Sequence, residues 1–358
     1  MLEILYLLGF FIPSSLHIMI QIQENISLQY LNTFGIDAKA RYFIEASSDE
    51  VLQELFHHTI FRNTKYLILG GGSNILFTKD FDGLVIKSAM TGIKVTAENN
   101  GFNFVRAGSG ENWHTLVMHC LRHEWGGLEN LSLIPGTVGA APIQNIGAYG
   151  VEVQNVIENV SGIELSTGTL RTFSNSDCHF NYRESIFKQE LKEKYFISSI
   201  TLRLTKKKHH LNTSYGAIQE VLKQHNITHP TIQNVSDAVI AIRKSKLPDP
   251  RVIGNAGSFF KNPTVRENDI ELIKKEYPSI PIYPIDNQNV KVAAGWLIEQ
   301  CGWKGKKFGN IGVHPQQALV LVNYGNGNGE EIFQLAMKIQ TSVKEKFGIT
   351  LTTEVNII

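Results

Sequence analysis

The stretch IPGTVGAAPIQNIGAYG, residues 134–150, decides how the rest of this chain is interpreted. Its glycines, Gly136, Gly139, Gly147 and Gly150, let main chain approach a ligand with no Cβ in the way. The interspersed isoleucines and valine argue against disorder. We therefore expect a segment packed around a flat or phosphorylated ligand. A plain connecting loop is the alternative.

A second small-residue segment follows a predicted buried strand. Tyr66–Leu69 has the pattern of such a strand and leads directly into Gly70-Gly71-Gly72-Ser73-Asn74. Successive backbone N–H groups in a turn of this kind point into one concavity, which suits a phosphate. A plain β-turn is the alternative.

The common nucleotide-binding motifs are absent from the sequence. Gly108-Ser109-Gly110 starts a G-x-G-x-x-G pattern, but Trp113 stands where its last glycine belongs. The pattern G-x-x-x-x-G-K-[ST] does not occur. Rossmann and P-loop folds are therefore disfavoured.

The composition is typical of a soluble globular protein with two or three domains. The chain has 358 residues, of which 42% are hydrophobic and 19% are charged. Its net charge of +1 gives no reason to expect a nucleic-acid or membrane-surface partner. Cys120, Cys178 and Cys301 are widely spaced and odd in number, which suits a reducing compartment. We expect a cytoplasmic monomer.

The apolar run Leu2–Ile20 resembles a signal peptide or membrane anchor at first sight. However, no Lys or Arg precedes Lys39, and polar residues and Pro13 interrupt the run before it reaches the ~20 residues of a membrane span. We expect a disordered or loosely docked extension. The alternative is that Met19 is the true start.

Hydrophobic periodicity and capping residues predict the main elements of the fold. The expected helices are one capped by Ser48 or Asp49, then Glu111–His123, Ser236–Ser245, Val292–Cys301 (amphipathic) and Glu330–Phe347; the expected strands are Tyr66–Leu69, Phe102–Ala107, a hairpin of Val156–Leu165 with Leu170–Phe173, and Tyr195–Leu204.

The histidines do not predict a metal site. His119 and His123 have the i, i+4 spacing of helical ligands, but no HExxH pattern or third ligand accompanies them. We expect a solvated helix face and no metal. The basic run 206–210 has the composition of a solvated linker, and we place a domain boundary there.

Several motifs together resemble a known enzyme family. They are GGGSN, IPGTVGAAPIQNIGAYGVE, NYRESIFK, KLPDP, GSFFKNP, VAAGWLIEQCGWKG, HPQQALVLVN and EVNII. In this order they are similar to the UDP-N-acetylenolpyruvoylglucosamine reductases, flavoenzymes of peptidoglycan precursor synthesis. The resemblance covers residues 30–358. The segment around Tyr215 is similar to the longer of the family's two forms.

The resemblance implies an α+β fold. An FAD-binding domain of the vanillyl-alcohol-oxidase type (residues 30–205) would consist of two α/β subdomains, about 30–88 and 89–205. A substrate-binding α+β domain would span 206–350, and residues 351–358 would return to the active site as a strand. Residues 1–29 would be an N-terminal extension.

The resemblance also implies the cofactor and the reaction. NADPH would reduce non-covalently bound FAD, which would then reduce UDP-N-acetylglucosamine enolpyruvate to UDP-N-acetylmuramate. The residues implied to hold FAD are Gly70, Gly71, Gly72, Ser73, Asn74, Pro135, Gly136, Thr137, Gly139, Ala140, Gln144, Asn145, Gly147 and Ala148.

Three residues match the family's catalytic positions: Arg183, Ser258 and Glu354. Hydride transfer to the enol ether leaves an enolate, and a permanently charged arginine suits that developing charge. A serine is a weak acid, but an enolate is a strong base, so proton donation by Ser258 is reasonable at hydrogen-bond distance. The resemblance assigns Glu354 to stabilising the intermediate, and Tyr149, Tyr215, Lys246 and Asn262 to binding the substrate.

Each catalytic residue has an alternative interpretation. Arg183 is equally suited to pairing with Glu184 or another acid, Ser258 to a turn, and Glu354 to a solvated chain end. The family's usual arginines are replaced by Asn356 and Pro315. Alternatives for the whole chain are another FAD oxidoreductase of this fold, or a non-catalytic flavin or nucleotide-sugar binding protein.

Overall fold

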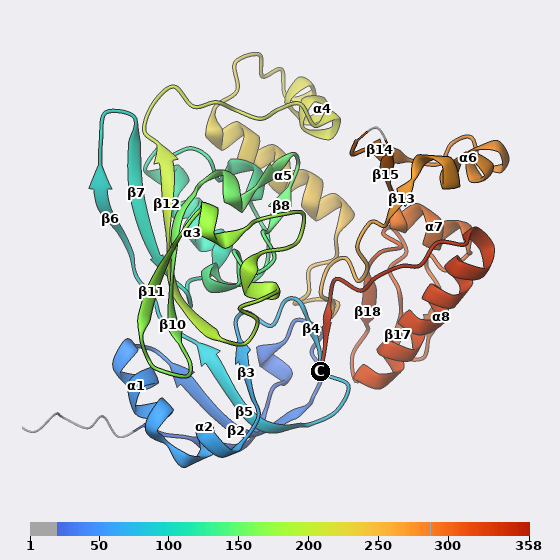
Figure 1. The fold of residues 1–358 in the computed structure, drawn as a ribbon. Helices are drawn as coiled ribbons and strands as arrows, with labels where there is room; N and C mark the ends of the chain where they lie inside the picture. The colour runs from blue at the N-terminus through green and yellow to red at the C-terminus, as the bar shows by residue number, and fades with distance from the viewer. Residues whose placement is uncertain (1–19, 287) are drawn as a thin grey trace, which may run out of the picture.

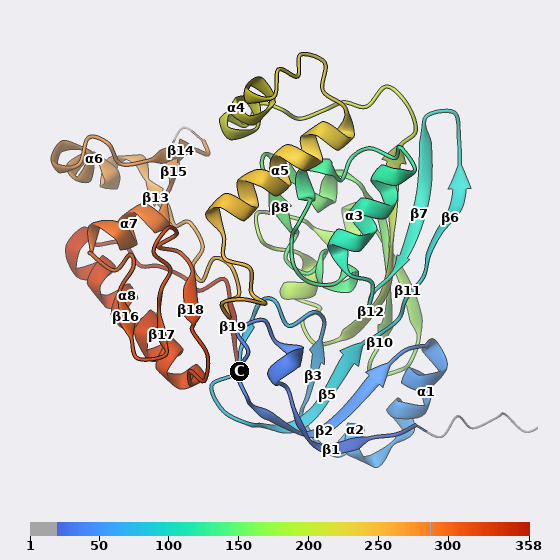
Figure 2. The ribbon, with the colours of Figure 1, turned by 180° about the vertical axis from the view of Figure 1, so that it is seen from behind.

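The computed structural model describes residues 20–286 and 288–358. Figures 1 and 2 show two sheets joined side by side, with the C-terminal part of the chain packed against one flank. Most of the apolar run Leu2–Ile20, and with it the alternative start at Met19, lies outside the described residues.

The first sheet has the strand order β1-β2-β5-β3. Its strands are β1 (Gln23–Ser27), β2 (Lys39–Ala46), β5 (Phe81–Ser88) and β3 (Tyr66–Leu69). β2, β5 and β3 are parallel, and β1 adds an antiparallel edge. We expected residues 1–29 to be an extension, but from Gln23 onward this is wrong, because backbone pairing with β2 recruits a polar segment into the sheet.

Helix α1 (Asp49–His57) covers this sheet as predicted. Ser48 is its N-cap and accepts a hydrogen bond from the backbone N–H of Val51, while Leu52 and Leu55 are fully buried on its inner face. A short helix, α2 (Thr59–Asn63), continues the layer.

The second sheet is antiparallel with the order β11-β10-β12-β7-β6. Its strands are β11 (Leu170–Ser174), β10 (Ile157–Glu164), β12 (Tyr195–Thr205), β7 (Phe102–Gly108) and β6 (Ile93–Glu98). The predicted hairpin is confirmed, since β10 pairs with β11 in register. Helix α3 (Trp113–Arg122) buries its predicted apolar stripe in the core beside this sheet.

Two helices beyond the second sheet form the upper part of the molecule in Figure 2: α4 (Gly216–Gln224) and α5 (Ile232–Lys246). α5 begins four residues before the predicted Ser236 because Thr231 and Asn234 form a reciprocal capping box. The Ser236 hydroxyl lies 2.7 Å from that of Ser132, so α5 is fixed to the segment that precedes the small-residue stretch.

The C-terminal part has two small sheets and three helices among its described residues. The elements are β13 (Thr264–Arg266), α6 (Glu267–Glu276), β14 (Ile282–Pro284), β15 (Asn289–Val292), α7 (Ala294–Gln300), β16 (Lys307–Phe308), β17 (Ile311–Val313), β18 (Leu321–Asn323) and α8 (Gly329–Phe347). α8 matches its prediction, and Asn328 caps its start.

The two ends of the described chain meet in one core. β19 (Asn356–Ile357) pairs in parallel with β4 (Ile75–Leu76), directly after the triple-glycine segment. Phe34 packs edge-on against Phe259 at 6.3 Å between ring centroids, in a cluster that also contains residues of α8. Figure 1 shows the C-terminus beside β4. Domain boundaries near residues 205 and 350 stay a prediction.

Candidate active site

Two glycine loops face each other at the edge of the first sheet. An ideal Cβ on Gly71 would lie 2.8 Å from Gly136 Cα, and one on Gly70 would lie 2.7 Å from Thr137 Oγ1. Backbone therefore approaches backbone here only because no side chain intervenes. The segments 70–74 and 134–150 form one cradle, and we call it the glycine cradle.

The second loop of the cradle is held from behind by the segment after β7. Val138 N–H donates to Glu111 O at 2.9 Å, and Gly139 N–H donates to Ser109 O at 2.9 Å. Ser109 is fully buried, and its hydroxyl lies 2.7 Å from that of Ser88 at the end of β5. The stretch that begins like a nucleotide fingerprint thus serves as a support that joins the two sheets.

The cradle contains an unsatisfied polar atom. Among the described residues, the buried Thr137 Oγ1 has no hydrogen-bond partner, and it faces Gly70. Buried hydroxyls are normally paired, so an unpaired one packed between the two glycine loops fits a polar ligand at the cradle. The donor set of the cradle, backbone N–H groups and hydroxyls, fits phosphate and nucleotide oxygens.

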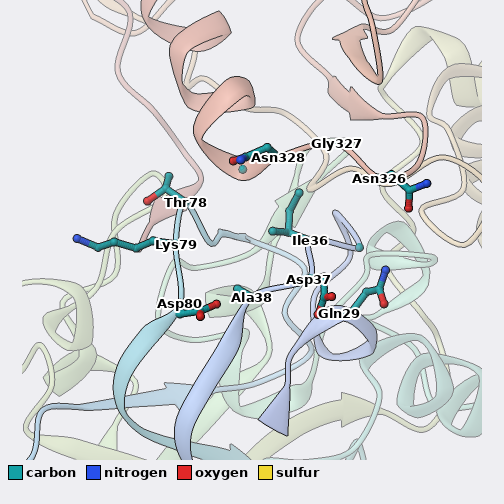
Figure 3. A pocket seen from close by; sticks show the side chains of 12 residues that line it. Gln29, Ile36, Asp37, Ala38, Thr78, Lys79, Asp80, Asn326, Gly327 and Asn328 are labelled. Carbon is teal, nitrogen blue, oxygen red and sulfur yellow. The ribbon is translucent and has the colours of Figure 1, made fainter. Parts of the chain in front are cut away.

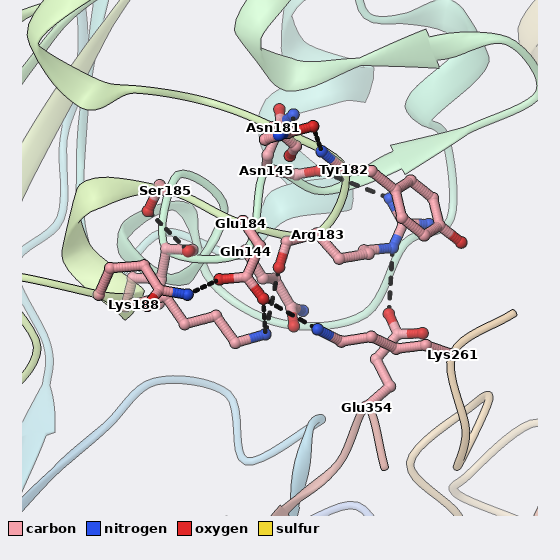
Figure 4. A network of polar contacts seen from close by, with 12 residues as sticks. Gln144, Asn145, Asn181, Tyr182, Arg183, Glu184, Ser185, Lys188, Lys261 and Glu354 are labelled. Atoms are coloured by element: carbon pink, nitrogen blue, oxygen red, sulfur yellow. Dashed lines mark hydrogen bonds and ion pairs between the residues drawn. The ribbon is translucent and has the colours of Figure 1, made fainter. Parts of the chain in front are cut away.

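Arg183 lies at the mouth of the cradle and pairs with Glu354. Its Nε is 3.1 Å from Glu354 Oε1, and its Nη2 donates to Gly147 O at 2.8 Å (Figure 4). Only 19% and 17% of the two side chains are exposed, so this pair is largely shielded from solvent. Arg183 thus pairs with an acid, as its alternative interpretation allowed, but this acid is Glu354 and not Glu184.

The segment that carries Ser258 is hydrogen-bonded to the segment that carries Glu354. Glu354 N–H donates to Phe259 O at 2.8 Å, and Lys261 N–H donates to Thr352 O at 2.9 Å, so residues 258–261 and 352–354 run antiparallel as one unit. The half-buried Ser258 hydroxyl makes no hydrogen bond to any described residue.

Asn74 joins the cradle to the C-terminal segment. Its Nδ2 donates to Gln144 Oε1 at 2.7 Å and to Glu354 O at 3.2 Å. Its carbonyl accepts hydrogen bonds from both the backbone and the side chain of Asn356. The asparagine that replaces the family's usual arginine thus binds the cradle directly.

The substrate-binding residues predicted from the resemblance are more dispersed. Tyr149 and Tyr215 are in edge-to-face contact at 5.2 Å between ring centroids. Lys246 is exposed in the last turn of α5. Asn262 Oδ1 accepts from Ala294 N–H at 3.0 Å and so stabilises the start of α7.

A polar pocket of about 410 Å³ lies elsewhere. Figure 3 shows it between the first sheet and the start of α8, and it contains none of the predicted site residues. Three of its polar groups are already engaged: Asp80 accepts from Lys39 N–H, Asp37 from the Ser27 hydroxyl, and Asn328 caps α8. We do not assign it to the active site.

Comparison with known proteins identifies the family. One family model, an FAD binding domain, matches residues 40–174, and another, the C-terminal domain of UDP-N-acetylenolpyruvoylglucosamine reductase, matches residues 249–358. The UDP-N-acetylenolpyruvoylglucosamine reductase of Flavobacterium johnsoniae is 50% identical, over 94% of this chain and 100% of its own. That of Amoebophilus asiaticus is also 50% identical, over 94% of this chain and 99% of its own. The chain belongs to the UDP-N-acetylenolpyruvoylglucosamine reductase family.

A solved structure supports the same fold. The UDP-N-acetylenolpyruvylglucosamine reductase from Thermus caldophilus superimposes with a TM-score of 0.64 at 21% identity, covering 94% of this chain and 99% of its own. The predicted fold class is confirmed, with an FAD-binding domain followed by the C-terminal domain of the reductase family. No helix within residues 20–286 and 288–358 is long and apolar enough to cross a membrane.

The sequence prediction missed several residues that the structure places at the site of this reductase-family member. Lys188 Nζ donates to Arg183 O at 3.2 Å, and Lys261 Nζ lies 2.9 Å from Glu184 Oε1. Lys291 Nζ lies 3.2 Å from the ring centroid of Tyr182. Only the positions of Glu184, Lys188 and Lys261 inside the quoted motifs signalled their importance, and Lys261 is 77 residues from its partner Glu184.

A half-buried arginine was also missed. Arg243, three residues before Lys246, donates through Nε to Leu133 O at 3.2 Å and so holds the start of the cradle loop. Burial lowers its pKa, and the Tyr149 hydroxyl beside it opposes that change. Burial likewise raises the pKa of Tyr149, so this phenol stays protonated and can donate a hydrogen bond.

Proposed function

We propose that this chain is an NADPH-dependent flavoenzyme that reduces UDP-N-acetylglucosamine enolpyruvate to UDP-N-acetylmuramate in peptidoglycan precursor synthesis. The observation that carries the proposal is the ion pair Arg183–Glu354 at the mouth of the glycine cradle. It places a fixed cation and a carboxylate beside two closely packed glycine loops in a member of the reductase family.

The residues of the cradle fit FAD. Bound there, FAD would supply the redox chemistry, accepting hydride from NADPH and delivering it to the substrate. Thr137 Oγ1, Ser73 and the backbone of residues 70–74 would hold its phosphates, and the remaining cradle residues predicted from the resemblance would line it.

Arg183 would stabilise the enolate that develops when hydride reaches the substrate. Its guanidinium is permanently charged and is fixed by Glu354 and Gly147 O before any substrate arrives. A pre-oriented donor needs no rearrangement at the moment of reaction, which is where such groups lower the barrier most. Glu354 would keep Arg183 in this orientation and assist in stabilising the intermediate.

Ser258 would complete the reaction by donating its hydroxyl proton to the carbon that bears the substrate carboxylate. Its Oγ has no partner among the described residues, so no competing hydrogen bond must be broken. Tyr149, Tyr215, Lys246 and Asn262 would bind the UDP part, with Lys246 contributing local positive charge.

An anaerobic experiment tests this function. The purified protein is loaded with FAD, reduced with NADPH, and then mixed with UDP-N-acetylglucosamine enolpyruvate. Return of the oxidised-flavin absorbance without oxygen is the expected result. Protein that takes up FAD but stays reduced would favour another FAD oxidoreductase, and protein that does not take up FAD would exclude both.

Gel filtration and cell fractionation test the proposed monomer and its cytoplasmic location.

A further inference from the structure

Glu184 lies in a half-buried cluster of charges beside the proposed active site (Figure 4). Its Oε1 is 2.9 Å from Lys261 Nζ and 4.0 Å from Lys188 Nζ, while Gln189 Nε2 donates to its Oε2 at 2.6 Å. The side chains of Glu184 and Lys261 are 28% and 21% exposed. The pair is therefore less screened by water than an ordinary surface ion pair.

Lys261 belongs to the segment that carries Ser258. Hydrogen bonds from Lys261 N–H to Thr352 O and from Glu354 N–H to Phe259 O fasten residues 258–261 to residues 352–354. A displacement of Lys261 would therefore also move Ser258, the proposed proton donor, and Glu354, the carboxylate partner of Arg183.

Two consecutive residues of one turn each form an ion pair with the unit made of residues 258–261 and 352–354. Arg183 binds Glu354, and Glu184 binds Lys261. The turn itself is closed by reciprocal backbone hydrogen bonds between Asn181 and Glu184, at 3.0 and 3.1 Å. Lys188 Nζ donates to the Arg183 carbonyl and so ties the turn to the segment that follows it.

We propose that Glu184 is a positioning residue, which through Lys261 sets the distance between Arg183 and the Ser258 hydroxyl. This inference rests on the proposed function, because it assigns Ser258 the proton that ends the reaction. Glu184 does not need to touch substrate or cofactor. Its role is to keep the C-terminal segment seated against the turn that presents Arg183.

The physical reason is the distance dependence of proton transfer. The Ser258 hydroxyl must lie within hydrogen-bond reach of the enolate carbon while Arg183 holds the charge. Without the carboxylate of Glu184, Lys188 and Lys261 would repel each other across the gap, and the segment 258–261 would lose its only described side-chain tie to the turn. Reduction of FAD by NADPH does not use this proton and should be insensitive to the change.

The experiment measures the two half-reactions separately by anaerobic stopped-flow. Glu184→Ala is expected to slow reoxidation by substrate about tenfold to hundredfold, the range for a misplacement near 1 Å, while reduction by NADPH changes by less than about twofold. Glu184→Gln keeps one hydrogen bond to Lys261 and should recover part of the loss. Glu193→Ala, which removes an exposed pair with Lys192 at 3.9 Å, is the matched control.

A double-variant cycle tests whether Glu184 acts through Lys261. Glu184→Ala combined with Lys261→Ala should be no slower than the slower single variant. Independent, additive effects would overturn the proposal, as would wild-type reoxidation in Glu184→Ala or equal slowing of both half-reactions. Failure of the proposed function itself would appear earlier, as wild-type protein that is not reoxidised by substrate at all.

Discussion

Arg183 has a left-handed backbone, with φ of 57°, although it is not a glycine. Non-glycine residues adopt this conformation at a cost and are found where surrounding contacts fix them. Here the Lys188 side chain binds the Arg183 carbonyl, and Glu354 and Gly147 O bind the guanidinium. This backbone geometry directs the long Arg183 side chain toward Glu354 and Gly147 O in the site.

Replacing this side chain tests its proposed charge-stabilising role. Arg183→Ala is expected to reduce turnover by about 10²–10³-fold, because one fixed donor at a developing oxyanion contributes that much. Steady-state turnover with saturating substrate and NADPH measures it. Arg41→Ala, which removes an exposed pair with Asp82 at 3.2 Å, serves as the control and should leave turnover unchanged.

Ser258 should act in only one half of the reaction. Ser258→Ala is expected to accept hydride from NADPH at the normal rate and to be reoxidised by substrate far more slowly, because no other described hydroxyl is carried by the segment 258–261. Rapid-mixing absorbance at the flavin band follows both steps. Loss of both steps together would contradict its assignment as the proton donor.

Glu184 predicts a pH dependence of stability. Burial raises the pKa of its carboxyl, but hydrogen bonds from Lys261 and Gln189 and the charges of both lysines outweigh burial and hold the pKa below the ordinary 4.5. Because the folded pKa is depressed, the stabilisation is present above about pH 4.5 and is lost as pH falls through the folded value. The melting-temperature difference between wild type and Glu184→Gln should be constant at neutral pH and shrink in acid. A difference that grows in acid would contradict this.

At the scale of elements, the glycine cradle depends on close backbone contact between two loops. Gly71→Ala would place a Cβ 2.8 Å from Gly136 Cα, so the loops must separate. Overpacking of this kind costs about 1–3 kcal/mol, which corresponds to roughly 5- to 150-fold in FAD affinity if only the cradle rearranges. Fluorescence titration of FAD measures the change. Gly101→Ala, with open space around it, should bind FAD normally.

Sequence patterns predicted the elements that are defined by residues close together in the chain. The stripe on α3 and the hairpin of β10 and β11 follow from periodicity within about a dozen residues. The start of α5 was misplaced because the capping box of Thr231 and Asn234 was overlooked. This capping box can be recognised from the sequence alone, so the start of α5 was predictable.

The active site was predictable only through resemblance. The pair Arg183–Glu354 joins residues 171 positions apart, and no spacing rule indicates it. The charge cluster around Glu184 was missed although the motifs that contain it were quoted, because the motif does not show which side chain meets which. Parallel pairing of β4 with β19 likewise carries no local signal.

At the scale of the molecule, residues 356–358 pair with the segment that follows the triple-glycine loop. Ile358 N–H donates to Leu76 O, and its carbonyl accepts from the Thr78 backbone and hydroxyl at 2.8 and 2.7 Å. Removing residues 356–358 should therefore lower the melting temperature and the turnover, because Glu354 loses its anchored neighbour. Asn356→Ala keeps the strand pairing and should have a smaller effect. Equal melting temperatures for wild type and the truncated protein would contradict this role of β19.

The contact between Asn74 and Glu354 spans 280 positions, and this separation orders events during synthesis. A ribosome makes the glycine cradle and Arg183 well before it makes Glu354. Until then the nascent chain carries a half-built site, in which the guanidinium lacks its carboxylate and β4 lacks its neighbour. Retention of FAD by the nascent chain should thus strengthen once Glu354 has been made and can bind Arg183 and Asn74.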